Sequence, residues 1–198
     1  MGLPTRDDVR EALLGKRQLA VFGEIDPGTD DYIADGLVML NAASADPILL
    51  WIDSHGGQTL PALTIFDRIR ISHAPVYGLV TYAAASSASL ILQACVVRAA
   101  LEHSRVHLHG VTYREVKLQY YLEEPDKFAE EGRRIQDFVF GVYTGRTKRT
   151  RDEIEALSKE EKPLFAEQAL AFGLIDQIVH TREEFEALVA MPQKGDQR

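Results

Sequence analysis

Short apolar runs alternate along the chain with longer stretches in which apolar residues recur at helical spacing. Strands are predicted over 19–22, 48–52, 76–81, 98–100, 105–108 and 174–179. The run 48–52 is continuously apolar, which is typical of a strand buried on both faces. Helices are predicted over 6–14, from the turn at 26–30 to about 45, and over 60–71, 87–94, 151–159, 167–172 and 182–190. This order predicts an α/β fold with a largely parallel sheet and right-handed crossovers.

A long polar stretch, 113–143, also has a helical pattern. Pro125 is expected to kink or break this helix, because proline lacks an N–H group and clashes with the preceding turn. Gly145 is expected to end it, because glycine tolerates the left-handed conformation of a helix C-cap. The chain contains no internal repeat, linker or low-complexity segment. We therefore predict a single domain over 1–198, in which the first ~12 and the last ~8 residues are peripheral.

Composition narrows the class of protein. Apolar residues make up 45% of the 198 residues and charged residues 26%, as in folded globular proteins. The net charge of −8 disfavours nucleic acid as a partner, and the basic run 146–151 is expected to be a solvated helix start. The single cysteine, Cys95, excludes an internal disulfide framework and is expected to be a buried core residue. With no apolar run long enough for a signal peptide or a membrane span, the expected location is the cytoplasm.

Candidate chemistry begins at Ser86. The predicted strand 76–81 is followed by a turn through three alanines and by a helix of small and apolar residues, and Ser86 stands where this helix starts. Unpaired N–H groups and the positive end of the helix dipole at that point suit a developing oxyanion. Serine is also a common N-cap, so the position alone leaves open whether Ser86 is a nucleophile or a cap.

A second candidate segment follows the strand 48–52. Residues 53–57 (Asp-Ser-His-Gly-Gly) are predicted to turn into the helix that begins near Leu60. Such a turn places free N–H groups at the carboxyl end of a parallel sheet, where open α/β sheets bind ligands. The two candidate segments are therefore expected to share one edge of the sheet.

Taken together, five segments resemble those of the Clp protease proteolytic subunits, the ClpP-like serine peptidases of the crotonase-like fold. They are 51–57, 83–92, 104–109, 143–145 and 169–178. The resemblance extends over about residues 13–180. It implies the ClpP/crotonase-like fold, with stacked βαβ units and a long handle helix.

The resemblance also implies roles for individual residues. The nucleophile of the family corresponds to Ser86 and its base to His109, while the oxyanion donors are the N–H groups of Gly57 and Ser87. The orienting acid corresponds to Glu161, and neighbouring Glu160 is the other candidate. A solvated helix end is an equally good interpretation of these two glutamates. The implied activity is hydrolysis of peptide bonds by a Ser-His-acid mechanism.

At the level of assembly, the resemblance implies a homo-oligomeric ring, typically two stacked heptamers, that is supplied with unfolded polypeptide by a Clp-type ATPase. No metal, organic cofactor or membrane partner is expected. Three departures from the family pattern bear on this. His55 replaces a proline beside the oxyanion donors, Pro125 falls in the handle helix, and the segment before Leu13 is short. Ring stacking and the ATPase partnership are therefore less firmly implied than peptidase chemistry.

Three alternatives remain open at this stage. A catalytically silent subunit of a mixed ring would keep Ser86 and His109 as packing residues only. A crotonase-like enzyme acting on acyl-CoA would use the same oxyanion device without needing Ser86. A metal site could combine His107 and His109 with His55, although the spacing matches no known ligand set. The remaining histidines, His73, His103 and His180, are expected at the surface or in loops.

Overall fold

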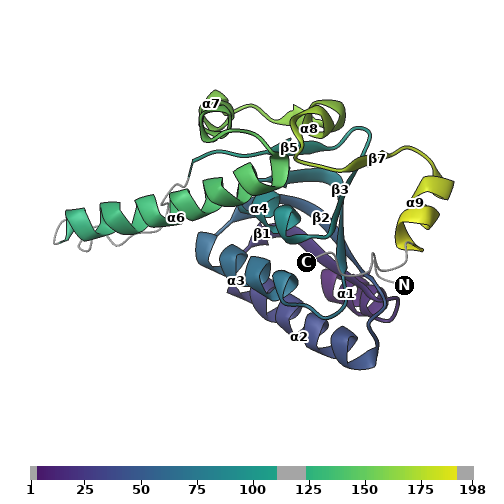
Figure 1. Ribbon diagram of the computed structural model, residues 1–198. Coiled ribbons are helices and arrows are strands. Elements are labelled where there is room, and N and C mark those ends of the chain that lie inside the picture. Colours follow the sequence, from purple (N-terminus) through teal and green to yellow (C-terminus); the bar gives the residue numbers. More distant parts are fainter. Residues whose placement is uncertain (1–3, 111–123, 191–198) are drawn as a thin grey trace.

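The computed structural model describes residues 4–110 and 124–190 (Figure 1). Its helices are α1 (Arg6–Leu14), α2 (Pro27–Ala43), α3 (Thr59–Arg70), α4 (Ser87–Ala94), α6 (Pro125–Thr147), α7 (Arg151–Glu160), α8 (Ala166–Phe172) and α9 (Arg182–Val189). Its strands are β1 (Gln18–Ile25), β2 (Ile48–Gly57), β3 (Val76–Ala85), β4 (Val97–Leu101), β5 (Arg105–His107), β6 (Leu164–Phe165) and β7 (Gln177–Val179).

The strands form one seven-stranded sheet. Its main path runs β1-β2-β3-β4-β7, and every pair along it is parallel. Strand β5 pairs in parallel with the end of β3, and β6 adds to β5 as the one antiparallel pair described. Helices α2, α3 and α4 connect successive parallel strands, so the predicted α/β architecture of stacked βαβ units is confirmed.

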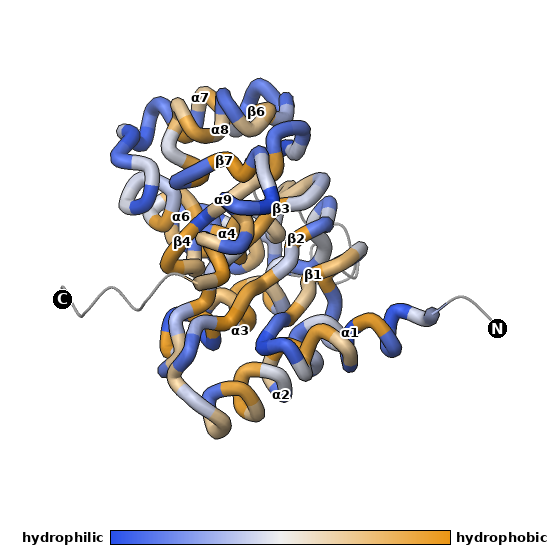
Figure 2. Tube along the Cα trace, turned by 90° about the vertical axis from the view of Figure 1, so that its right-hand side faces the viewer, coloured by the Kyte–Doolittle hydropathy of each residue, from blue (hydrophilic) through white to orange (hydrophobic). Residues whose placement is uncertain are grey.

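Two clusters of buried hydrophobic residues pack helices against the sheet. The larger cluster joins β1, β2 and β3 to α2, α3, α4 and α6, and it contains the deeply buried side chains Ile33, Ile52, Ile65 and Ile91. The smaller cluster includes Leu49, Tyr77, Leu79 and Leu188, and it places α9 against the sheet on its own (Figure 1). The tube in Figure 2 shows α1 and α7 alternating between hydrophilic and hydrophobic positions, as expected for helices at the periphery.

Two strands continue further than the sequence pattern predicted. Strand β2 extends through the Gly-Gly segment to Gly57, which pairs with Ile25 of β1. Strand β3 extends through the three alanines to Ala85, which pairs with His107. The predicted turns at these positions are wrong, because pairing with neighbouring strands outweighs the low strand propensity of glycine and alanine. Strand β1 likewise continues past Gly23, at a bulge, whereas β7 is shorter than predicted.

Helix α6 is the long helix that projects from the body in Figure 1. Pro125 is its first residue, where the missing N–H is tolerated, so of the predicted kink or break at this position the structure shows a break. Gly145 lies inside the helix, which ends at Thr147 with Lys148 in the left-handed conformation. The part of the predicted helix from 113 to 123 lies outside the described residues.

The basic run 146–151 was expected to be a solvated helix start. Helix α7 does start at Arg151, but two other arginines of the run bond to the rest of the fold. Arg146 donates to the Cys95 carbonyl oxygen (2.8 Å), and Arg149 donates to the carbonyl oxygens of Ala171 (2.9 Å) and Phe172 (3.2 Å). These bonds fasten the end of α6 to the end of α4 and to α8. The run is therefore engaged within the fold. No helix in the described ranges 4–110 and 124–190 is long and apolar enough to cross a membrane.

We expect Phe185→Ala to loosen α9 and to expose Trp51, the single tryptophan of the chain. The two rings pack with centroids 5.5 Å apart, and the capping and side-chain hydrogen bonds described for α9 stay within the helix and its start. Because Phe185 is half-buried, its removal should lower the free energy of unfolding by about 1–2 kcal/mol. Tryptophan emission should shift to longer wavelength. Phe138→Ala, on α6 against Phe66, is the control and should leave the emission unchanged.

Candidate active site

Ser86 occupies a sharp turn between β3 and α4. Its backbone angles are φ 56° and ψ −125°, a conformation that non-glycine residues rarely adopt. Ser86 is the N-cap residue of α4, as one of the two interpretations predicted, but its side chain makes no capping hydrogen bond to the helix. A strained serine at a strand-to-helix turn is the arrangement by which hydrolases expose a nucleophilic hydroxyl.

Two glycines allow the end of β2 to lie very close to neighbouring backbone, Gly56 to the Ser86 turn and Gly57 to β1. Gly56 has φ +96°, and a Cβ atom added to it would lie 2.8 Å from both Ser86 Cβ and the Ala85 carbonyl oxygen. A Cβ atom on Gly57 would lie 2.2 Å from the Ile25 carbonyl oxygen. Neither position can accept a side chain without a backbone shift. The Gly-Gly segment therefore fixes a backbone surface directly beside Ser86.

Both predicted oxyanion donors lie on this surface. The Gly57 N–H group donates to the Ser87 hydroxyl oxygen at an N···O distance of 2.8 Å. As the first residue of α4, Ser87 has an N–H group for which the helix supplies no acceptor. The structure thus brings Gly57 and Ser87 into contact, although they are far apart in the sequence. The sequence analysis did not predict the bond from the Gly57 N–H group to the Ser87 side chain. The one feature of the sequence that could have suggested it is the second serine, next to Ser86.

His109 reaches the site through strand pairing. Strand β5 pairs with the end of β3, and the Ser86 N–H group donates to the His107 carbonyl oxygen at 2.8 Å. His109 follows two residues later and is partly exposed. Its Nδ1 atom lies 2.6 Å from the Gly110 carbonyl oxygen. Because a carbonyl only accepts, Nδ1 carries the proton and Nε2 of the neutral ring is left as the basic nitrogen.

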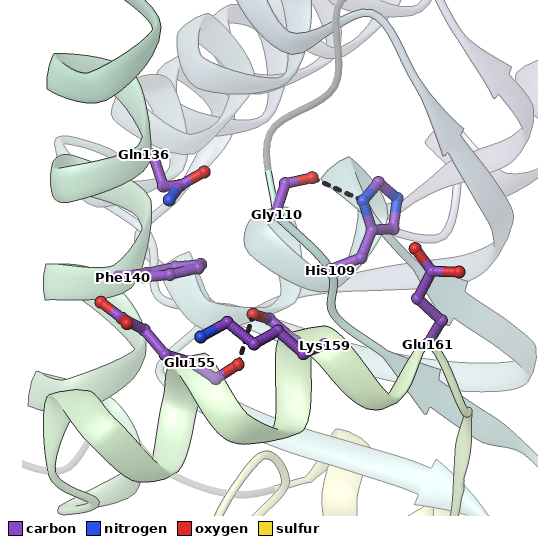
Figure 3. A pocket seen from close by; sticks show the side chains of 8 residues that line it. His109, Gly110, Gln136, Phe140, Glu155, Lys159 and Glu161 are labelled. Atoms are coloured by element: carbon purple, nitrogen blue, oxygen red, sulfur yellow. Dashed lines mark hydrogen bonds between the residues drawn. The ribbon is translucent and has the colours of Figure 1, made fainter.

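Glu161 lies beside His109 in the same pocket (Figure 3). It follows α7 as a left-handed C-cap with φ 51°, and the antiparallel pairing of Val106 with Leu164 brings this segment to β5. The pocket has a volume of about 350 Å³, and its lining includes Gly110, Phe140 and Lys159. Glu160 does not line it. Of the two glutamates considered, the structure places Glu161 next to the histidine.

The hydrogen bonds of a complete Ser-His-acid relay are not formed in this conformation. Within the described residues, no hydrogen bond joins the Ser86 hydroxyl to His109 or joins Glu161 to His109 Nδ1, which the Gly110 carbonyl occupies. Catalytic hydrogen bonds are often long or misaligned before substrate binds. His109 and Glu161 thus share a pocket, and Ser86 lies beside β5 at the end of β3, without a hydrogen bond that links the three side chains.

His107 adds a second imidazole next to the site. Its ring centroid lies 5.6 Å from that of His109. Burial lowers the pKa of His107, and the neighbouring His109 lowers it further, while Glu161 acts in the opposite direction. His55 instead packs edge-on against Tyr82 with centroids 6.0 Å apart. Among the described residues, no three His, Cys, Asp or Glu side chains are grouped closely enough to hold a metal ion.

Cys95 lies in the core, as predicted. It is fully buried, and burial raises the pKa of its thiol to about 12. A thiol in this state is a poor nucleophile at neutral pH. His73, His103 and His180 are exposed, also as predicted. We therefore assign no role in the candidate site to Cys95 or to these three histidines.

The chain matches the model of the family described as Clp protease over residues 4–182. It is similar to the ATP-dependent Clp protease proteolytic subunit 1 of Protochlamydia amoebophila, with 29% identity over 185 residues, which cover 91% of this chain and 89% of the relative. It is also similar to the ATP-dependent Clp protease proteolytic subunit 3 of a Synechococcus species, with 30% identity over 178 residues, 87% of this chain and 86% of the relative.

Proposed function

The chain belongs to the Clp protease family, and we propose that it hydrolyses peptide bonds as a serine peptidase with Ser86 as the nucleophile. The observation that carries this proposal is the conformation of Ser86, which is strained, makes no capping bond and stands at a strand-to-helix turn. Strain of this kind persists where the surrounding structure enforces it, and the Ser86 turn is closely surrounded, since the backbone of Gly56 packs against it with no room for a side chain.

The proposed reaction follows from the groups around Ser86. Nε2 of His109 takes the hydroxyl proton as Ser86 Oγ attacks the carbonyl carbon of the substrate, and the negative charge develops on the carbonyl oxygen. The N–H groups of Gly57 and Ser87 bind this oxygen. His109 then gives the proton to the leaving amine. Water, activated by the same histidine, hydrolyses the acyl-enzyme and releases Ser86.

Glu161 would orient His109 and stabilise its protonated form. Its place beside the ring in Figure 3 supports this role, which requires that its carboxylate replace the Gly110 carbonyl as the partner of Nδ1. The Gly110 bond already selects the tautomer in which Nε2 is basic.

For the assembly, we propose a homo-oligomeric ring, with two stacked heptamers as its expected form, that acts on unfolded polypeptide together with a Clp-type ATPase. The names of both relatives, ATP-dependent proteolytic subunits, support this proposal. The single buried cysteine fits a reducing compartment such as the cytoplasm. An acyl-CoA enzyme of crotonase type is less well supported, because it has no use for a strained, uncapped Ser86.

The test is mass spectrometry of the assembled protein after incubation with a fluorophosphonate, beside the Ser86→Ala variant. We expect one adduct on the wild type, located on Ser86, and none on the variant. Ser89→Ala, a neighbouring serine of α4, is the matched control and should be labelled like the wild type. Absence of an adduct on a verified oligomer would contradict the proposal and would favour a catalytically silent subunit.

A further inference from the structure

The side chain of Ser87 occupies a group that the proposed reaction needs. Its hydroxyl oxygen accepts from the Gly57 N–H group at 2.8 Å, and its O–H points back to the Gly57 carbonyl oxygen over a longer distance of 3.4 Å. The side chain is buried, with 9% of the residue exposed. The Gly57 amide is therefore engaged inside the protein, on the same surface where the oxyanion would bind.

Gly57 has little freedom to move away from Ser87. Its backbone lies against that of Ile25, where a Cβ atom would come within 2.2 Å of the carbonyl oxygen, and the next amide, Gln58 N–H, donates to the same oxygen at 2.8 Å. Ser87 begins α4 and is held by that helix. The movable element between the two backbones is thus the Ser87 hydroxymethyl group, which can change rotamer.

From these contacts we infer that the side chain of Ser87 is a positioning group that keeps the Gly57 N–H group covered until the oxyanion developing on the substrate displaces its hydroxyl. The inference rests on the proposed function and deepens it. A serine oxygen is a good acceptor, so it satisfies the amide in the free protein, and it competes with the oxyanion for the same donor. The Ser87 side chain acts on the reaction through Gly57, because its bond to the Gly57 N–H group determines how readily that group can bind the oxyanion.

The inference predicts that removing the acceptor speeds the reaction at Ser86. In Ser87→Ala the Gly57 amide is free in advance, so the maximal rate of labelling by a fluorophosphonate should rise about two- to tenfold, the factor that one net hydrogen bond represents. The concentration for half-maximal rate should stay unchanged, because the oxyanion forms only in the transition state. Ser87→Cys preserves the size but offers a much weaker acceptor, and it should also be faster.

The experiment compares labelling rates of the assembled wild type with those of Ser87→Ala, Ser87→Cys and Ser89→Ala. Ser89 lies in the same helix, its hydroxyl makes no bond to Gly57, and its variant should label like the wild type. Hydrogen exchange of a peptide spanning 54–60 provides a second readout, since the amide of Gly57 should exchange faster in Ser87→Ala than in the wild type.

The possible outcomes separate the inference from the proposed function. Labelling that depends on Ser86 but is equally fast or slower in Ser87→Ala overturns the inference alone, and a slower rate would identify the hydroxyl as an oxyanion donor. Unchanged exchange at 54–60 overturns it as well. If no variant is labelled, the proposed function fails and the inference fails with it. Labelling seen only in the Ser87 variants would support the inference and contradict the proposed function, because Ser86 of the wild type would then be silent.

Discussion

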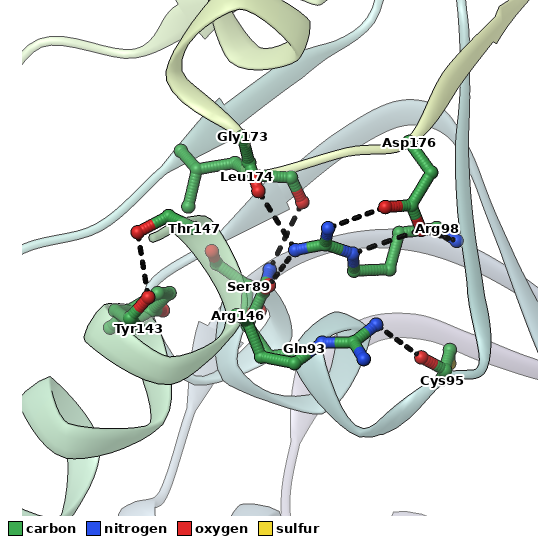
Figure 4. A network of polar contacts seen from close by, with 10 residues as sticks. All are labelled: Ser89, Gln93, Cys95, Arg98, Tyr143, Arg146, Thr147, Gly173, Leu174 and Asp176. Carbon is green, nitrogen blue, oxygen red and sulfur yellow. Dashed lines mark hydrogen bonds and ion pairs between the residues drawn. The ribbon is translucent and has the colours of Figure 1, made fainter. Parts of the chain in front are cut away.

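Asp176→Asn is expected to lower the free energy of unfolding by about 3 kcal/mol, the largest loss of stability that we predict for a single polar group. Asp176 accepts from the Arg98 backbone N–H (2.8 Å) and from two nitrogens of the Arg98 guanidinium (Figure 4). The Arg98 side chain is 5% exposed, whereas that of Asp176 is 41% exposed. The substitution would leave a buried guanidinium without its counter-charge. Because water reaches position 176, we expect a loss of free energy at the lower end of the range known for broken buried ion pairs.

This ion pair is part of a larger network that fixes the last third of the fold. Arg98 also donates to the Gln93 side chain (2.6 Å) and to the Gly173 carbonyl oxygen (2.9 Å), and Gln93 donates to the Leu174 carbonyl oxygen (3.2 Å). Helix α4, strand β4 and the connection from α8 to β7 therefore meet at one guanidinium (Figure 4). Since α4 begins next to Ser86, the network also supports the site.

Thermal unfolding at a fixed protein concentration checks this prediction, with an expected decrease in Tm of about 6–12 °C. The control is Asp137→Asn, which breaks an exposed ion pair to Arg151 and should cost less than about 1 kcal/mol. Burial raises the pKa of Asp176, but the bonds and charge of Arg98 outweigh it and leave this pKa below its ordinary value of 3.8. The contribution is thus complete above pH 3.8 and is lost as the pH falls through the lower folded pKa. Equal losses in both variants would contradict the prediction.

Local signals in the sequence were sufficient to place some helix ends, although Gly145, the predicted end of α6, lies inside that helix. Thr5 and Gly173, the predicted start of α1 and end of α8, have these roles because the capping bond or the positive φ involves only neighbouring residues. Strand ends depend on partners elsewhere in the chain. Gly57 and Ala85 belong to strands because Ile25 and His107 lie opposite them, and a glycine-rich or alanine-rich segment gives no local sign of such pairing.

The site was predictable at the level of residue types, and less so in its contacts. The order of motifs was enough to propose Ser86, His109 and Gly57, which follow or end strands β3, β5 and β2 of one sheet. Whether Glu160 or Glu161 faces His109 depends on the left-handed turn at Glu161, which reverses the chain after α7. The bond from Gly57 to the Ser87 side chain depends on a rotamer, for which sequence spacing carries no information.

Glu161→Gln is expected to lower kcat for peptide hydrolysis by about 10²–10³-fold. In the Ser-His-Asp template, replacing the acid by its amide costs about 10⁴-fold, because the histidine then adopts the wrong tautomer. In this chain the Gly110 carbonyl oxygen, 2.6 Å from His109 Nδ1, can still select the correct tautomer. The remaining loss is that of the negative charge which stabilises the protonated imidazole, so the effect should be large but smaller than in the template.

Glu160→Gln is the matched control, since it removes the same charge one residue earlier and outside the pocket, and its kcat should stay within about twofold of the wild type. Steady-state kinetics of the assembled protein on a short peptide substrate separates the two variants without requiring an ATPase. KM should be nearly the same in both, because neither carboxylate is proposed to contact the substrate. A similar decrease in kcat in both variants would indicate that the total negative charge at the end of α7 matters, and not the position of one carboxylate. A decrease confined to Glu160→Gln would assign the acid to the other glutamate and would require the left-handed turn after α7 to rearrange in the assembly.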